Sequence, residues 1–252
     1  MKLTAFPALL GALLLVAASP AQETRGPAAV EVAQRLQTAL GGVDAWNNTR
    51  FVRFDFKVGP SGDLPAGRAH LWDKWDGRYR LEQQTKEGKT QVVLFNAYNK
   101  TGDVYVDGVK LPAEEAAPLL ERAHGAFIND MYWLAMPWKW LDPGVNLKAL
   151  GEKEYNGKTY DVVELSFNSV GLTPGDHYQG FVAKDSNLME HWEYTLQSGN
   201  TGSWDWEYVE TNGIRLAKTH KNAEGREINM GAVTASSEVN EAHFTDPKAM
   251  LR

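Results

Sequence analysis

Six histidines are the side chains of this sequence best suited to bind a metal ion. His177 and His191 fall on two predicted strands that can be neighbours, close to Glu193, and two histidines with a carboxylate can bind zinc. No histidine belongs to an HxH or HExxH pattern, and single histidines on strands are more often surface residues. We therefore predict neither a metal ion nor another cofactor. The six are His70, His124, His177, His191, His220 and His243.

Carboxylates near tryptophans form a second candidate site, because paired carboxylates beside aromatic rings suggest glycoside hydrolysis. They are Asp73, Asp76, Glu82, Asp205, Glu207 and Glu210. Strand alternation argues against this use, since it directs Asp205 and Glu207 toward water and Trp204 and Trp206 inward. The sequence also lacks cysteine, a GxSxG motif and the glycine motifs that bind phosphates or dinucleotides. We predict that the protein is not an enzyme.

Aromatic residues are the more informative group. The sequence has nine Trp, nine Tyr and nine Phe, and such rings fill cores and ligand cavities. The segment 131–144, MYWLAMPWKWLDPG, has a single charge, Lys139, among its first eleven residues, so it needs apolar surroundings on every side. Pro137 must interrupt a helix that runs through this segment. We expect a short helix, a kink and an extended piece that cover the concave face of a curved sheet.

The aromatic pattern predicts a binding site for an apolar or amphipathic ligand. Large barrels enclose cavities, because the side chains of about a dozen strands cannot fill the middle. Two alternatives stay open: a solid core that holds no ligand, and exposed tryptophans that stack on the sugar rings of a glycan. The predicted ligand-binding residues are Phe54, Phe56, Met131, Trp133, Trp138, Trp192, Tyr194, Trp204, Trp206 and Tyr208.

The N-terminal sequence has the pattern of a secretory signal peptide. Lys2 precedes an apolar run from Leu3 to Ala18, and the small residues of Ser19-Pro20-Ala21 follow, so we expect residues 1–21 to be removed. No second apolar run approaches the length of a membrane-spanning helix, so we expect no integral membrane span after cleavage. We predict a bacterial periplasmic or secreted location. With 26 basic and 32 acidic side chains and no basic block, nucleic acid is a poor candidate partner.

Period-two alternation dominates the chain after residue 50. In FVRFDFKV at 51–58, Phe54 and Phe56 point away from Asp55, which indicates a strand that is dry on one face and wet on the other. Apolar residues at helical spacing predict helices at 28–40 and 112–130. About a dozen strands joined by short turns predict one antiparallel sheet that curls to hide its apolar face. Other predicted strands include 67–75, 89–96, 103–109, 147–155, 158–168, 176–185, 188–197, 203–210, 214–221 and 227–239.

Three stretches carry a resemblance to a known family: GGVDAW at 41–46, FVRFDFKV at 51–58 and PWKWLDPGV at 137–145. With the signal peptide and the helical insert, this layout resembles the periplasmic lipoprotein-localisation carriers of the LolA/LolB type. It is also similar to uncharacterised bacterial secreted proteins of the same layout. The resemblance implies an unclosed barrel with a helical lid and a hydrophobic cavity for acyl chains. It carries over no individual site residue. The sequence itself shows no linker between two halves, so we predict a single domain over residues 22–252.

We therefore predict a mainly β (α+β) fold, in which a strongly curved antiparallel sheet forms a half-open barrel around a helical plug and an N-terminal helix packs across one end. The predicted activity is non-catalytic binding or carriage of a hydrophobic small molecule, a lipid or a lipoprotein acyl chain. Removal of apolar area from water would drive binding, at about 25 cal/mol per Å². A glycan-binding module and a solid-core structural or interaction protein are the alternatives.

Overall fold

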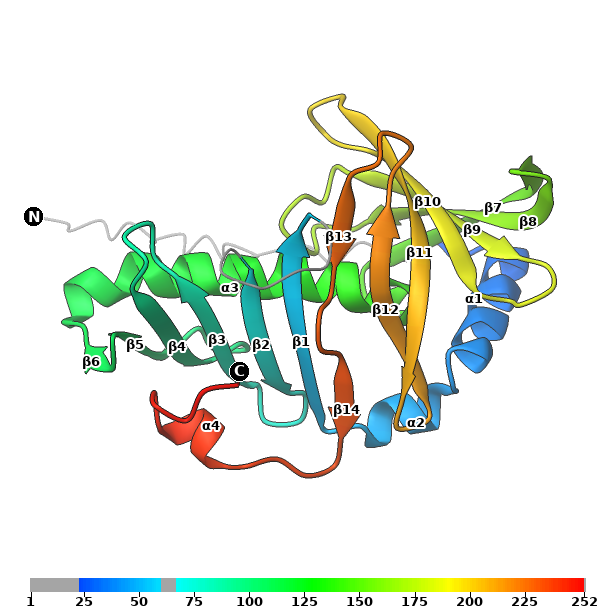
Figure 1. The fold of residues 1–252 in the computed structure, drawn as a ribbon. Helices are drawn as coiled ribbons and strands as arrows, with labels where there is room; N and C mark the ends of the chain where they lie inside the picture. The colour runs from blue at the N-terminus through cyan, green and yellow to red at the C-terminus, as the bar shows by residue number, and fades with distance from the viewer. Residues whose placement is uncertain (1–22, 60–66, 252) are drawn as a thin grey trace, which may run out of the picture.

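The computed structural model describes residues 23–59 and 67–251, and the predicted signal peptide lies outside these ranges (Figure 1). Within them, 14 strands form one antiparallel sheet in the spatial order β6-β5-β4-β3-β2-β1-β13-β12-β11-β10-β9-β8-β7, with β14 beside β1. The predicted curved antiparallel sheet is confirmed. The strands are β1 (Phe51–Val58), β2 (Arg68–Asp73), β3 (Arg78–Gln84), β4 (Thr90–Asn96), β5 (Gly102–Val106), β6 (Val109–Lys110), β7 (Val145–Tyr155), β8 (Lys158–Phe167), β9 (His177–Ala183), β10 (Met189–Thr195), β11 (Thr201–Thr211), β12 (Ile214–Lys221), β13 (Glu227–Asn229) and β14 (Thr234–Ser236).

The sheet consists of two meanders that meet in its middle. Strands β1 to β6 form one meander and β7 to β13 the other, and they are joined where Lys57 and Val58 of β1 pair with Asn229 and Ile228 of β13. The last strand of the first meander, β6, and the first strand of the second, β7, therefore lie at opposite edges. Because these two edges do not pair with each other, the barrel is unclosed.

The connection between the two edges is the long helix α3 (Ala113–Ala135), followed by the 3-10 helix η1 (Met136–Lys139). A helix of 23 residues spans about 35 Å, and Figure 1 shows α3 running across the sheet from the side of β6 toward β7. The buried residues of α3 include Ala123, Phe127, Met131 and Leu134, which face the sheet. The predicted helical plug is thus confirmed, and its topological origin is a crossover between sheet edges.

Two details of the helical segment differ from the prediction. The helix continues to Ala135 instead of ending at residue 130, and a 3-10 turn takes the place of the predicted extended piece. Proline lacks the N–H that would bond to the carbonyl four residues earlier in an α-helix, and its ring clashes with that carbonyl. The α-helix ends at Ala135, and Pro137 lies in the 3-10 turn that follows.

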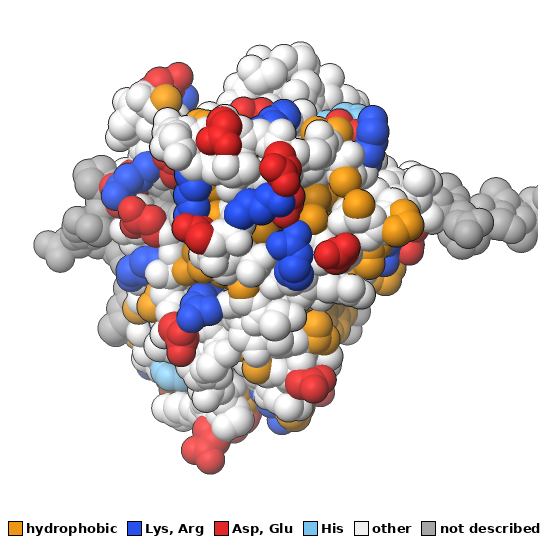
Figure 2. Space-filling view, turned by 90° about the vertical axis from the view of Figure 1, so that its right-hand side faces the viewer, with side chains coloured by type: hydrophobic (Ala, Val, Ile, Leu, Met, Phe, Trp, Pro, Cys, Tyr) orange, Lys and Arg blue, Asp and Glu red, His pale blue; other side chains and the backbone are white. Residues whose placement is uncertain are grey.

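The N-terminal helix α1 (Pro27–Ala39) confirms the predicted helix at 28–40. It buries Ala29, Val32, Ala33 and Leu36 and lies at one end of the sheet, beside β7 and β8 (Figure 1). The short helices α2 (Val43–Asn48) and α4 (Ala242–Thr245) were not predicted. Figure 2 shows the end of the molecule that lies on the right in Figure 1, where basic and acidic side chains are interspersed. No helix in the described ranges combines the length and the apolar character needed to cross a membrane.

The prediction of a single strand at 227–239 is wrong in one respect, because this segment forms two short strands, β13 and β14. Both pair with β1, and the interruption between them contains Gly231 with φ of 55°. A side chain at this position would collide with Asp55 of β1. The chain therefore leaves the regular ladder at Gly231 and returns to it at Thr234.

Candidate functional site

Four strands of the second meander place an aromatic surface on the concave face of the sheet. Trp192 of β10 lies opposite Trp204 of β11, and Trp206 of β11 lies opposite His220 of β12. Alternation puts Trp204 and Trp206 on the same face. The exposed fractions of Trp192, Trp204 and Trp206 are 3%, 8% and 4%, and His220 has none. The neighbouring β10 and β11 expected from the sequence are confirmed.

Helix α3 inserts Trp133 into this surface. The Trp133 ring lies 5.1 Å from Trp192, 5.4 Å from Trp204 and 5.1 Å from His220 between centroids, each time in an edge-to-face arrangement. Next to it, Tyr132 lies 5.8 Å from Tyr178 of β9. Edge-to-face aromatic pairs add about 0.5–1.5 kcal/mol beyond the area that they bury, so these contacts attach the end of α3 near Trp133 to the sheet.

The structure brings some of the predicted ligand-binding residues together and separates others. Tyr194 lies 5.6 Å from Trp192, and Tyr208 lies 6.3 Å from Trp206, so both belong to the concave aromatic surface. All ten predicted residues belong to the main apolar core or pack against it. The group on the concave surface consists of Trp133, Trp192, Tyr194, Trp204, Trp206 and Tyr208.

The other predicted residues lie apart from this surface. Phe54 stacks on His70 with 4.4 Å between ring centroids, and Phe56 faces the Arg68 guanidinium at 5.0 Å, both in the first meander. Trp138 of η1 stacks on Trp46 of α2 at 5.0 Å. Met131 is buried on α3, with 6% of its surface exposed. Because the tryptophans of the concave surface are buried or half-buried, they do not form the exposed platform that glycan stacking needs.

Sequence reasoning missed His220 as a member of the concave surface. A register shift between Glu207 and Tyr208 makes Tyr208 pair with Ala217 and Glu207 with Thr219, which leaves Lys218 as an extra residue in β12. The bulge places Ala217 and His220 on the same face, whereas strict alternation would separate them. No local pattern marks this bulge, so the sequence showed only one more scattered histidine.

A buried ion pair joins α3 to the first meander. Arg68 donates hydrogen bonds from Nε to Asp130 Oδ2 at 2.6 Å and from Nη2 to Oδ1 at 2.8 Å. His70 Nε2 lies 3.0 Å from Asp130 Oδ2, and Tyr79 Oη lies 2.9 Å from His70 Nδ1. Asp130 and His70 are fully buried. The chain connects α3 to the sheet at the two ends of the helix, and this ion pair attaches the helix to the sheet at an interior position.

The protonation states of this group follow from burial and from its partners. Burial acts to raise the pKa of Asp130, but hydrogen bonds with His70 and Arg68 outweigh it, and the pKa lies below its usual range. Burial lowers the pKa of His70, and the Asp130 carboxylate only partly opposes the shift. At neutral pH the group therefore contains an ionised Asp130, a charged Arg68 and a neutral His70.

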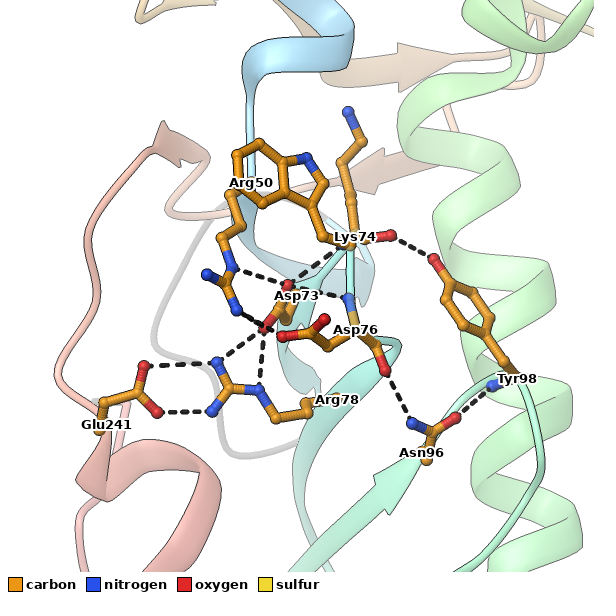
Figure 3. Close-up of polar contacts among 9 residues, drawn as sticks. Arg50, Asp73, Lys74, Asp76, Arg78, Asn96, Tyr98 and Glu241 are labelled. Carbon is orange, nitrogen blue, oxygen red and sulfur yellow. Dashed lines mark hydrogen bonds and ion pairs between the residues drawn. The ribbon is translucent and has the colours of Figure 1, made fainter.

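The carboxylates considered for hydrolysis are engaged in ion pairs. Figure 3 shows Asp73 at the centre of one group, where Arg50 donates to it from Nε at 3.1 Å and Arg78 from Nη2 at 2.7 Å. Arg78 also binds Glu241, which precedes α4. Burial acts to raise the pKa of Asp73, but the hydrogen bonds from the two arginines outweigh it and lower the pKa. A carboxyl group held in its ionised form in this way is unsuited to donate a proton as a general acid.

The remaining candidates for chemistry are dispersed. Glu82 accepts a hydrogen bond from Arg80, and Asp205 lies 2.7 Å from His191 Nδ1 on the opposite face of the strand from Trp204 and Trp206. His177 pairs with Thr195 near the far end of β10, away from His191. Within residues 23–59 and 67–251, no group of three or more His, Asp or Glu side chains could hold a metal ion.

The concave face is filled by α3. One surface hollow lies between α1 and the turn that contains Ser186 and Asn187, and another lies beside Arg78 and Phe244. Neither is lined by residues of α3. A ligand on the concave aromatic surface would therefore take the place of α3 side chains such as Trp133.

The structure is an unclosed antiparallel sheet, and the helix α3 covers its apolar concave face. No model of a protein family matches the sequence, and a search of curated proteins found no match. The chain is similar to a solved structure of a DUF1329 family protein from Desulfovibrio piger, with 13% identity, a TM-score of 0.48, and coverage of 86% of this chain and 95% of that one.

Two further solved structures are similar to the chain. One is a putative outer membrane lipoprotein-sorting protein domain from Vibrio parahaemolyticus, with 12% identity, a TM-score of 0.45, and coverage of 86% and 96% of the two chains. The other is a LolA superfamily protein from Nitrosomonas europaea, with 12% identity, a TM-score of 0.43, and coverage of 84% and 97%. At such identities the likeness concerns layout, and no function follows from it.

Proposed function

We propose that this protein binds an apolar or amphipathic ligand, such as a lipid or an acyl chain, on the concave aromatic surface, and that α3 is a displaceable cover. The observation that carries the proposal is that one helix alone covers this surface. The proposal includes a non-catalytic carrier in the bacterial periplasm, with residues 22–252 as a single domain. Trp133, Trp192, Tyr194, Trp204, Trp206 and Tyr208 would contact the ligand.

The form of α3 supports a role as a cover. A core helix is buried all round, whereas α3 is buried on one side and leaves Leu119, Leu120 and Ile128 only half-buried. Gly125 lies in the middle of the helix, where glycine is destabilising by about 1 kcal/mol relative to alanine. A helix with these properties separates from the sheet more readily than one fully enclosed in the core.

The burial of an apolar ligand also supplies free energy for the replacement of α3 on the concave aromatic surface. An acyl chain buries about 0.8 kcal/mol per methylene group, which is about 11 kcal/mol for 14 of them. This gain acts against the loss of the contacts between α3 and the sheet, and the sheet face stays dry in both states. An apolar ligand can therefore replace α3 without exposing the surface to water.

Mass spectrometry of the protein purified without detergent tests the proposal. We expect a lipid or fatty acyl compound to co-purify in a defined ratio, and a fluorescent fatty acid to bind to protein from which that lipid was extracted. The solid-core alternative predicts neither result. Absence of both, in protein that is folded by circular dichroism, would rule out the proposed function.

A further inference from the structure

Three buried side chains with polar ring nitrogens lie together on the concave aromatic surface: Trp192, Trp206 and His220. Nε1 of each indole has no hydrogen-bond partner among the described residues, and His220 bonds to the backbone of Trp133 in α3. The rings of Trp206 and His220 lie 4.3 Å apart, and those of Trp192 and Trp206 lie 5.7 Å apart, between centroids. All three side chains are more than nine-tenths buried. The Trp133 ring of α3 covers them.

Such a group of atoms is unusual, because buried polar atoms in native proteins nearly always form hydrogen bonds. The fold supplies partners for other indoles: Trp138 Nε1 donates to the Arg215 carbonyl at 2.9 Å, and Trp140 Nε1 lies 3.0 Å from Met136 Sδ. Two unsatisfied indoles, beside a histidine whose partner is the covering helix, therefore point to a ligand that completes the group when α3 is displaced.

The charge of this group selects the kind of ligand atom. Burial lowers the pKa of His220 to about 3, and a backbone contact with Trp133 only partly opposes the shift, so the imidazole is neutral. The neutral ring supplies one N–H donor and the two indoles supply two more. No cation belongs to the group, so a carboxylate or phosphate buried here would stay uncompensated. The atoms are suited to an uncharged oxygen that accepts hydrogen bonds.

We propose that Trp192, Trp206 and His220 bind the carbonyl oxygen of an uncharged ester or amide in the ligand. The site therefore prefers acyl esters and amides to hydrocarbons and to free fatty acids. This inference rests on the proposed function and adds the chemical class of the ligand. Displacement of Trp133 with α3 uncovers the donors, and the acyl chain then lies along the tryptophans of β10 and β11.

Competition binding with matched ligands tests the inference. Methyl dodecanoate, dodecanoic acid and tridecane each displace a fluorescent apolar probe from lipid-free protein, and their dissociation constants are compared at pH 7.5. We expect the ester to bind at least about 10-fold more tightly than the hydrocarbon, because each hydrogen bond formed by a buried donor contributes up to about a factor of 10. Equal affinities of the ester and the hydrocarbon would overturn the inference and leave the proposed function intact.

Two variants assign the preference to these residues. Trp206→Phe and His220→Phe each remove a hydrogen-bonding group and keep an aromatic ring, so we expect the ester preference to fall at least threefold, with hydrocarbon affinity little changed. The melting temperature of Trp206→Phe without ligand should stay the same or rise, because an unsatisfied polar atom has been removed. Variants that keep the full ester preference would overturn the assignment.

A second readout does not depend on the variants folding. In wild-type protein labelled with ¹⁵N-tryptophan, the ester should move two indole N–H proton signals downfield, as a new hydrogen bond does, while tridecane should not. Signals that respond equally to both ligands would mean that the ester oxygen accepts no hydrogen bond from these indoles, which bind an internal water or stay without a partner. That result would overturn the inference. Failure of every ligand to bind would instead reject the proposed function itself.

Discussion

Arg68 Nε donates a hydrogen bond to Asp130 Oδ2 at 2.6 Å, and this contact ties the interior of α3 to the first meander while Trp133 ties it to the second. The Asp130 side chain is fully buried, whereas 32% of the Arg68 side chain is exposed. The helix is thus attached to both halves of the sheet, by an ion pair on one side and by aromatic contacts on the other.

Arg68→Ala should lower the free energy of unfolding by about 2–4 kcal/mol. The change leaves the Asp130 carboxylate buried without its main cation, and removal of one partner of a buried ion pair is strongly destabilising. Urea unfolding followed by tryptophan fluorescence measures the effect. The double variant Arg68→Met with Asp130→Leu should recover most of the loss, since no buried charge is left, and a double variant as unstable as the single one would contradict this account.

Trp133→Ala should weaken binding of a fluorescent fatty acid more strongly than it lowers the melting temperature. The side chain touches the concave surface through three ring contacts, so its removal affects the proposed site directly. The matched control is Trp46→Ala, which removes the stack on Trp138 far from the concave surface. Equal losses of binding in the two variants, in proportion to their losses of stability, would favour the solid-core alternative.

Stability should fall as the pH decreases from about 6.5 to 5. The pKa of His220 is about 3 in the folded protein against an ordinary value of 6.5, so in this range the unfolded chain binds a proton that the folded protein excludes. The contribution of neutral His220 is therefore complete above pH 6.5 and decreases below it, by up to about 2 kcal/mol at pH 5. Burial also lowers the pKa of His70, which acts in the same direction.

Urea unfolding at pH 7.5, 6.0 and 5.0 measures this dependence. The variant His220→Phe should lose the part of the slope between pH 6.0 and 5.0 that His220 supplies and keep the part that His70 supplies. Asp130 contributes only at lower pH, because its pKa lies below its usual range. An identical slope in the wild type and in His220→Phe would show that His220 is not held neutral.

Asp73→Asn should lower stability without changing ligand binding. Asp73 joins Arg50 and Arg78 at the outer end of β2, and Arg78 continues to Glu241 next to α4 (Figure 3). The variant removes the charge that both arginines bind, so we expect a loss of about 1–3 kcal/mol by urea unfolding. Fatty-acid binding at 25 °C serves as the second measurement, and a changed affinity would mean that this group is coupled to the concave surface.

Local sequence patterns were sufficient to predict much of the fold. Alternation in HWEY and SWDWEY predicted the neighbouring strands on which Trp192 and Trp204 lie opposite each other. The apolar segment after Asp130 predicted a cover for the concave face, because no side of it tolerates water. These inferences succeed because side-chain direction within one strand or helix depends on neighbouring residues only.

Other features depend on contacts between distant parts of the chain and leave no local pattern. The pairing of Lys57 with Asn229, which joins the two meanders, connects residues that are far apart in sequence. The bulge at Lys218 brings His220 onto the concave surface, and the Arg68–Asp130 pair links a strand to a helix. Sequence alone predicted a half-open barrel with an aromatic interior, but neither the polar atoms within it nor the attachment of its cover.

A reversible chemical bridge between α3 and the sheet tests the central claim most directly. The sequence has no cysteine, so Arg68→Cys with Asp130→Cys supplies the only two thiols, which a short bis-methanethiosulfonate reagent can join in place of the ion pair. The bridged protein should bind the fluorescent fatty acid at least about 10-fold more weakly than the same protein after dithiothreitol cleaves the bridge. Equal binding before and after cleavage would contradict the claim that the ligand replaces α3 on the concave surface.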